Sequence, residues 1–223
     1  MSRTVFSVRQ NGITVLSSTG IFLQEIKMDF LKTHGWWIAI VLIVGGIIVS
    51  GMNTIPTQDE QVKAAWSEVQ NQYQRRMDLI PNLVNTVKGA SNFEQSTLVE
   101  VINARAAATK VTISSDLINN PEAMKQFEQV QGTLGSALSH LMAVSENYPD
   151  LKSNQQYQTL MSQLEGTENR IAIARRDYIS TVQTYNITVR TFPGVIWASI
   201  YHAGPKAEFE ATQGADQAPA VKF

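Results

Sequence analysis

The feature that most restricts the fold of this chain is a run of residues without any charge. No Asp, Glu, Lys or Arg occurs from Gly35 to Gln58, and residues 36–49 are apolar if the two glycines are counted as such. Extended to Met52, the run reaches the length of about 17 residues that an α-helix needs to cross a bilayer. Because backbone polar groups in lipid must pair within their own segment, a helix is the expected form. We predict one transmembrane helix over residues 35–52.

The N-terminal flank of this run suits a membrane boundary. Trp36 and Trp37 stand at its start, after Lys32 and His34, and tryptophan favours the interface between lipid and water. Two alternatives remain for the same residues. One is a buried core helix, and the other is a cleaved signal peptide, for which residues 49–52 make a poor cleavage site.

Basic residues are more frequent before the run than after it. Lys63 alone lies close on the far side, whereas the near side holds Arg3, Arg9, Lys27 and Lys32. The positive-inside rule therefore predicts a cytoplasmic N-terminus and a large domain on the other side. A start at Met28 is an alternative that would remove most of this asymmetry. Residues 1–34 have no periodicity long enough to bury a face, and we expect a poorly ordered N-terminal extension.

A helix-packing pattern organises the stretch that follows. Apolar positions separated by alternating steps of four and three continue from Val62 to Val87, which is typical of a helix buried along one face. Arg76 is the polar exception, and Pro81 lies beside the stripe without shifting its register. We expect Pro81 to kink this helix without ending it. The carbonyl of Met77 then needs a new donor, for which the candidates are a neighbouring helix, Asn82 and Asn85.

Capping and turn residues predict that the rest of the chain is also helical. A break at residues 53–57, around Pro56, should precede the first helix of the domain. The helices expected from caps and periodicity cover residues 58–88, 92–110, 121–146 and 154–191. The predicted fold class is therefore all-α, with a single N-terminal transmembrane helix and an antiparallel four-helix bundle (up-down-up-down) over residues 57–192. Residues 193–223 form a C-terminal segment and tail.

Three charged residues occupy positions where a buried seam calls for apolar side chains: Arg76, Glu168 and Arg175. If the first and fourth helices pack together, these residues form an Arg–Glu–Arg network that fixes register more than it adds stability. The alternatives are side chains that extend to the edge of the bundle and, with least support, a catalytic role.

The sequence gives little sign of catalytic chemistry. Its three histidines, His34, His140 and His202, have no second histidine or neighbouring acid at ligand spacing. It has no cysteine and no nucleophile or phosphate-loop motif. A net charge of -1 without a basic stripe argues against nucleic acid. We predict no enzymatic activity, no catalytic residues, no cofactor and no metal.

The C-terminal region carries two candidate contact segments. Four helices of alternating direction return the chain to the membrane end, where residues 192–201 should lie. Their apolar side chains suit an interfacial contact, although they could instead cap the open end of the bundle: Ile196, Trp197, Ile200 and Tyr201. At the end of the tail, Val221 and Phe223 alternate as in a docking strand.

Several segments together resemble the LemA family of bacterial membrane proteins: AWSEVQNQYQRRMDLIPNLVNTVKG, NYPDLKSN, LEGTENRIAIARRDYISTVQTYN, FPGVIWASIYH and PAVKF. The resemblance covers nearly all of residues 28–223. It implies one N-terminal membrane helix, an antiparallel four-helix bundle, no established enzymatic activity, and a link to membrane organisation and membrane proteases. One departure is ASNFE at residues 90–94, where the family usually has Tyr-Ala and then a His before Glu.

These observations predict a non-enzymatic scaffold, anchored by a single pass in the bacterial cytoplasmic (inner) membrane. Its expected partners are the lipid bilayer, other copies of itself in a homo-oligomer, and another membrane protein such as a protease. By assembling, it would organise or shape the bilayer. The alternative is an adaptor or sensor module for a membrane protease or an envelope-stress system, with Val221 and Phe223 as its docking tail.

Overall fold

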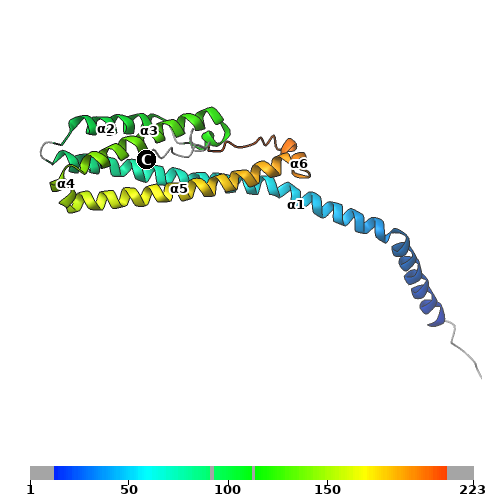
Figure 1. The fold of residues 1–223 in the computed structure, drawn as a ribbon. Helices are drawn as coiled ribbons and strands as arrows, with labels where there is room; N and C mark the ends of the chain where they lie inside the picture. The colour runs from blue at the N-terminus through cyan, green and yellow to red at the C-terminus, as the bar shows by residue number, and fades with distance from the viewer. Residues whose placement is uncertain (1–12, 91–92, 112–113, 210–223) are drawn as a thin grey trace, which may run out of the picture. The chain divides into compact units, whose positions relative to one another are not determined.

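The computed structural model describes residues 13–90, 93–111 and 114–209, and all secondary structure in these ranges is helical. Contacts divide the chain into two compact units, Met1–Gly51 and Met52–Phe223. The elements follow one another as shown in Figure 1: α1 (Ile13–Lys88), α2 (Gln95–Lys110), the short 3-10 helix η1 (Ser115–Asn119), α3 (Pro121–Ser145), α4 (Pro149–Ser153), α5 (Gln155–Arg190) and α6 (Gly194–Ile200).

The first unit contains the beginning of α1. Of the N-terminal extension expected over residues 1–34, residues 13–34 are helical, and residues 1–12 lie outside the described chain. No proline occurs between Ile13 and Ile55, so backbone hydrogen bonds can continue along this stretch without a buried face. Within the described chain, one helix is long and apolar enough to cross a membrane, with a mean hydropathy of 2.3 in its most apolar window.

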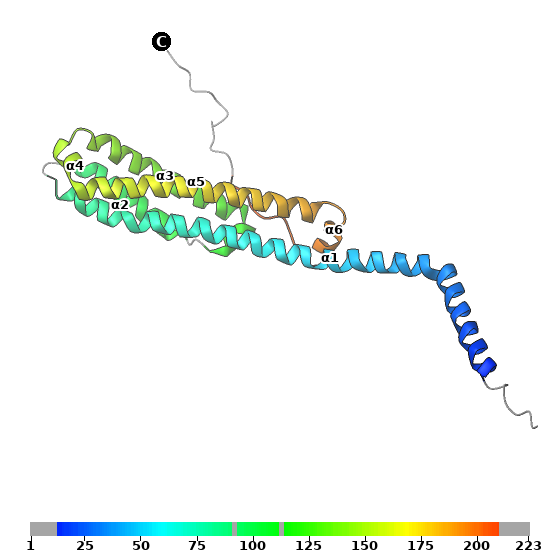
Figure 2. The ribbon, with the colours of Figure 1, turned by 90° about the horizontal axis from the view of Figure 1, so that it is seen from below.

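The second unit is a helical domain with two hydrophobic clusters along its length. In two views α2 lies beside α3, and α5 runs beside the C-terminal part of α1 (Figures 1 and 2). The first cluster, which contains Trp66 and Phe127, draws on α1, η1, α3, α5, α6 and the chain after α6. The second cluster, which contains Leu83 and Leu141, draws on α1, α2, α3, α4 and α5.

Helix α1 continues through two prolines, Pro56 and Pro81. The expected break at residues 53–57 was therefore wrong, whereas the expectation that the helix passes Pro81 was right. A proline inside a helix has no N–H, so the carbonyl four residues earlier loses its donor. For these prolines the carbonyls concerned belong to Met52 and Met77.

Each of these carbonyls accepts a hydrogen bond from a side chain of another element. The Arg105 Nε of α2 donates to the Met77 oxygen at 3.2 Å. The Tyr201 hydroxyl, directly after α6, donates to the Met52 oxygen at 3.1 Å. A neighbouring helix was one of the expected sources of a donor to Met77, and this helix is α2. The bond to Met77 is partly buried, so it satisfies a group that would otherwise carry a desolvation cost, whereas the bond to Met52 lies at an exposed position.

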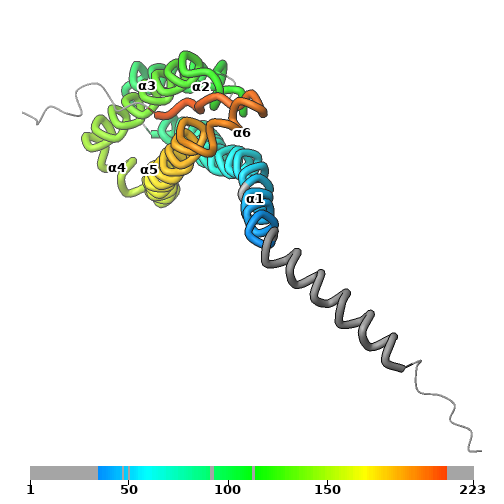
Figure 3. The backbone as a smooth tube through the Cα atoms, turned by 90° about the vertical axis from the view of Figure 1, so that its right-hand side faces the viewer, coloured from blue at the N-terminus to red at the C-terminus, as the bar shows by residue number. Residues whose placement is uncertain are grey.

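The chain after α6 is extended and packs against the first cluster through Ala207 and Phe209. In Figure 3 this segment, coloured orange to red, passes between α5 and the α2–α3 pair. The Asn186 amide pairs with both backbone groups of Lys206, at 2.8 and 3.0 Å. The Ala207 amide donates to the Ile118 carbonyl at 2.8 Å, and the Ala207 carbonyl accepts from the Tyr178 hydroxyl at 2.7 Å.

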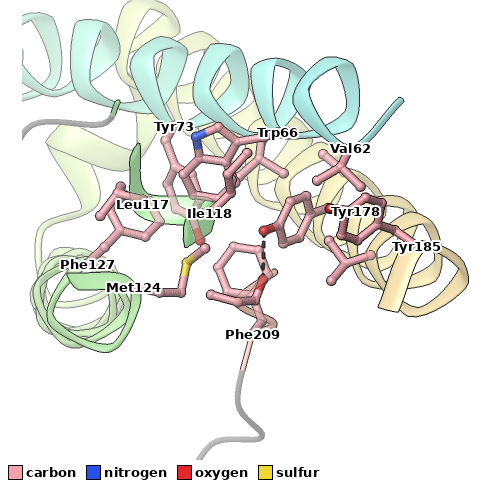
Figure 4. Packing of buried hydrophobic residues seen from close by; sticks show 14 of the residues in the cluster. Val62, Trp66, Tyr73, Leu117, Ile118, Met124, Phe127, Tyr178, Tyr185 and Phe209 are labelled. Carbon is pink, nitrogen blue, oxygen red and sulfur yellow. Dashed lines mark hydrogen bonds between the residues drawn. The ribbon is translucent and has the colours of Figure 1, made fainter. Parts of the chain in front are cut away.

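Phe209 anchors this extended segment at its far end. Its ring lies 6.0 Å from Trp66 and 5.5 Å from Tyr178, centroid to centroid (Figure 4). The guanidinium of Arg175 lies 4.2 Å from the centre of the same ring, a distance typical of a cation–π contact. Ala207 and Phe209 of this segment are therefore part of the core of the domain.

The donor to Met77 can be tested by a double-mutant cycle. We expect Arg105→Met to lower the free energy of unfolding by about 1–2 kcal/mol, because it leaves the Met77 carbonyl unpaired. In a Pro81→Ala background the new N–H of residue 81 can serve that carbonyl, so Arg105→Met should cost less. The measurement is unfolding of the full-length protein in detergent. Additivity of the two substitutions within about 0.5 kcal/mol would contradict the assignment.

Candidate functional site

A layer of polar side chains separates the two hydrophobic clusters. Arg76 is 3% exposed and lies between Tyr73 of the first cluster and Met77 of the second. Its Nη1 donates to Glu168 of α5 at 2.7 Å, and its Nη2 donates to the side-chain oxygen of Gln131 of α3. The layer therefore ties α1, α3 and α5 together at one level.

The predicted Arg–Glu–Arg network is only partly present. Arg76 and Glu168 form an ion pair, in which the Glu168 side chain remains 44% exposed. Arg175 lies instead 3.5 Å from Glu128 of α3 and against the ring of Phe209. Its expected place beside Glu168 was wrong, because α3 supplies a second carboxylate and the extended segment supplies an aromatic face. The arrangement places charge at the edge of the core, where it can set register.

A second cluster of polar groups lies where the domain begins, which we call the Met52 end. The Tyr201–Met52 hydrogen bond brings α6 to this end. Gly194 permits the tight turn from α5 into α6, since a Cβ there would collide with the backbone of Thr188. Helix α6 is anchored on one side by buried Ala198 and half-buried Trp197, which pack against the first cluster.

The other side of α6 and its flanks expose large apolar side chains. Ile196 is 48% exposed and Ile200 is 59% exposed. The remaining members of this patch, which we call the α6 apolar patch, are Phe192, Val195 and Tyr201. Of the four residues predicted to contact lipid here, Ile196, Ile200 and Tyr201 are exposed, and Trp197 is partly covered by the domain.

Beside α6 the Met52 end contains a cavity of about 560 Å³. Its lining includes Asp59, Asn119, Tyr185, His202 and Lys206. His202 has a backbone φ of 52°, in the left-handed region that non-glycine residues adopt infrequently. The cavity thus combines a carboxylate, an ammonium, an amide and aromatic surface.

An ion-pair network includes two residues of the cavity lining, Asp59 and Lys206. Lys206 Nζ lies 2.6 Å from Asp59 and donates to Asn119 at 2.9 Å, and it stands 5.4 Å from the Tyr185 ring centre. Lys63 lies 2.8 Å from the other Asp59 oxygen. Burial raises the pKa of Asp59, but the hydrogen bonds and charges of Lys206 and Lys63 outweigh it and leave the pKa below its ordinary value.

Sequence reasoning missed this cavity and the segment that closes it. Asp59, Asn186, Lys206 and Phe209 were not among the predicted site residues. An available signal was the break at Gly204-Pro205 followed by alternating Ala207 and Phe209, which is the pattern of an extended segment with one buried face. The alternation used for prediction was instead that of Val221 and Phe223 at the end of the tail.

The remaining predicted site residues are the tryptophan pair of the apolar run and two residues of the tail. Trp36 and Trp37 are exposed, with ring centroids 4.1 Å apart. Val221 and Phe223 lie outside the described residues. Among the side chains that the structure describes, no group of three His, Asp or Glu could hold a metal ion.

Residues 65–223 match the family model described as the LemA family. Among curated proteins, magnetosome protein MamQ 2 of Paramagnetospirillum magneticum is 29% identical over 157 residues, covering 63% of this chain and 58% of that protein. Magnetosome protein MamQ of Magnetospirillum gryphiswaldense is 27% identical over 157 residues, with the same coverage. Protein LemA of Metamycoplasma hominis is 23% identical over 146 residues, 66% of this chain and 63% of that one. The chain spans about three fifths of the length of these relatives.

The polar layer is tested by removing the charge of Glu168. We expect Glu168→Gln to lower the free energy of unfolding by about 1–2 kcal/mol, because Arg76 stays buried while its half-exposed counter-ion becomes neutral. Glu165→Gln, at an exposed position of the same helix, should change it by less than about 0.5 kcal/mol. Thermal unfolding in detergent compares the two. Equal effects would refute a specific role for Glu168.

The Asp59 network predicts a dependence of stability on pH. A carboxyl whose pKa is lower in the folded state stabilises the fold above its unfolded pKa, and this contribution is lost as pH falls through the folded value. Melting temperatures from pH 7 down to pH 3 should therefore fall less steeply below about pH 4 for Asp59→Asn than for the unaltered protein. Asp150→Asn, at an exposed position, should keep the original slope. Parallel curves for all three proteins would contradict the prediction.

Proposed function

We propose that this chain, which belongs to the LemA family, is a non-enzymatic, membrane-anchored scaffold that organises the bilayer. The apolar part of α1 is the single-pass anchor, with the N-terminus in the cytoplasm. The domain formed by residues 52–209 is the assembling part. The α6 apolar patch gives this domain a second contact with lipid.

One observation carries this proposal, the hydrogen bond from Tyr201 to Met52. Met52 is the last residue of the transmembrane helix predicted over residues 35–52, which needs this residue to reach a length of about 17 from Trp36. If the run spans a bilayer, Met52 therefore lies at its surface. Because Tyr201 is bonded to Met52, the patch beside it lies at the same surface. Apolar and aromatic residues on a short helix are suited to that interface.

The proposed architecture of the domain is an antiparallel four-helix bundle. The long helices α1, α2, α3 and α5 would alternate in direction, up-down-up-down, so that the end of α5 comes back to the Met52 end. The cores shared by α1, α3 and α5 support this arrangement. The short elements η1 and α4 would act as parts of the connections between long helices.

A scaffold with two lipid contacts favours assembly with copies of itself. The anchor and the α6 apolar patch would hold each domain in one orientation on the surface, which reduces the orientational freedom lost on association. Homo-oligomers are therefore the proposed partners, together with the bilayer and another membrane protein. The adaptor alternative depends on Val221 and Phe223, and the described chain adds no support for it.

The second lipid contact is tested with single cysteines, which the natural sequence lacks. A fluorophore on Ile196→Cys in full-length protein reconstituted in vesicles should be quenched by lipids that carry a nitroxide near the headgroup. The matched control is Val99→Cys, which is similarly exposed, 45% against 48%, and lies on α2, away from α6 (Figure 1). Equal quenching of both labels would refute the contact. Electron microscopy of the same vesicles would show whether ordered assemblies or deformed membranes form.

A further inference from the structure

We propose that the cavity at the Met52 end binds the headgroup of phosphatidylethanolamine. This inference rests on the proposed function, because the lipid reaches the cavity only if the Met52 end lies at the membrane surface. It adds a specific ligand to a contact that is otherwise only apolar. The cavity combines both signs of charge, donors and acceptors, and an adjoining apolar surface.

The charge balance of the lining favours a zwitterion. Asp59 and Lys206 line the cavity as an ion pair 2.6 Å apart, with side chains 23% and 10% exposed. A ligand with only a negative charge would face the Asp59 carboxylate, and a ligand with only a positive charge would face the Lys206 ammonium. A ligand that carries both charges can place its positive group next to Asp59 and its negative group next to Lys206. Such a ligand adds no net charge to the partly desolvated site.

The lining already holds one primary ammonium, that of Lys206. Its acceptors are Asp59 and Asn119, and the Tyr185 ring lies 5.4 Å away. A carboxylate has about four lone-pair sites, so Asp59 can accept a further N–H beside Lys206 and Lys63. Ethanolamine has N–H groups to donate there, whereas choline has none. This chemistry selects ethanolamine over choline.

Two residues that line the cavity have backbone or side-chain N–H groups left for a phosphate. A lysine ammonium has three N–H groups, and Lys206 directs two of them to Asp59 and Asn119. The backbone amide of Gly204, which also lines the cavity, donates to no group in the described chain. His202 lines the same wall with its backbone in the left-handed region, a conformation that is enriched at ligand-binding positions.

The acyl chains have an apolar surface beside the cavity. Tyr201 belongs both to the cavity lining and to the α6 apolar patch, so the two are continuous. A headgroup in the cavity would leave its glycerol at the rim and its chains toward Ile200 and Ile196. The volume of about 560 Å³ lies in the usual range of small-molecule sites, about 300–1,000 Å³.

The test is native mass spectrometry of the full-length protein in detergent, with phosphatidylethanolamine, phosphatidylcholine or phosphatidylglycerol of identical acyl chains. We expect phosphatidylethanolamine to bind about tenfold more tightly than the other two, the ratio expected for one charge-assisted hydrogen bond. Equal retention of the three lipids, or a preference for phosphatidylglycerol, would overturn the proposal. This comparison needs no variant and so does not depend on whether a variant folds.

Two variants separate this inference from the proposed function. Asp59→Asn should reduce the affinity for phosphatidylethanolamine to that for phosphatidylcholine. Retention of the preference would overturn the headgroup assignment. Ile196→Ser should weaken the binding of all three lipids alike and keep the order of their affinities. If the Ile196 label is not quenched in vesicles while the preference persists, the proposed function fails and the cavity chemistry stands. Binding of soluble O-phosphoethanolamine as tightly as the lipid would assign the cavity to a free metabolite and overturn the lipid proposal.

Discussion

Backbone hydrogen bonding in α1 is the constraint on which the rest of the domain depends. Pro56 and Pro81 each remove a donor from this helix, and each leaves one carbonyl without its helical partner. The domain satisfies both carbonyls from outside the helix, with Arg105 from α2 and Tyr201 from the end of α6. The two prolines therefore create attachment points, at which α1 is fixed to elements that come much later in the chain.

Between these attachment points, the polar layer divides the core into two parts. A continuous hydrophobic seam permits helices to slide by one turn, because neighbouring apolar residues can replace one another. Arg76 has well-defined partners in Gln131 and Glu168, and a slip would leave its guanidinium buried without them. The Glu168 side chain remains open to water on one side, so the layer avoids most of the cost of a fully enclosed ion pair.

Sequence reasoning was most successful where a pattern repeats along a helix. The seam from Val62 to Val87 correctly predicted the buried face of α1, and Arg76 and Glu168 were expected to meet because both interrupt such seams. It failed where the outcome depends on a distant partner. Pro56 was expected to break the helix, because no local sequence pattern shows that the Tyr201 hydroxyl donates a hydrogen bond to the Met52 carbonyl. Arg175 was assigned to Glu168, since the sequence does not show that Glu128 and Phe209 lie closer.

The extended segment after α6 explains why the Met52 end has any internal space. A helix at this position would fill the groove between α5 and η1 with side chains on all sides, whereas an extended chain presents alternate residues to the core. Ala207 and Phe209 occupy the hydrophobic side, and Lys206 turns back to Asp59 and Asn119. The backbone groups of Lys206 and Ala207 are paired with Asn186, Ile118 and Tyr178. The same residues that complete the core therefore leave a charged cavity beside the apolar surface of α6.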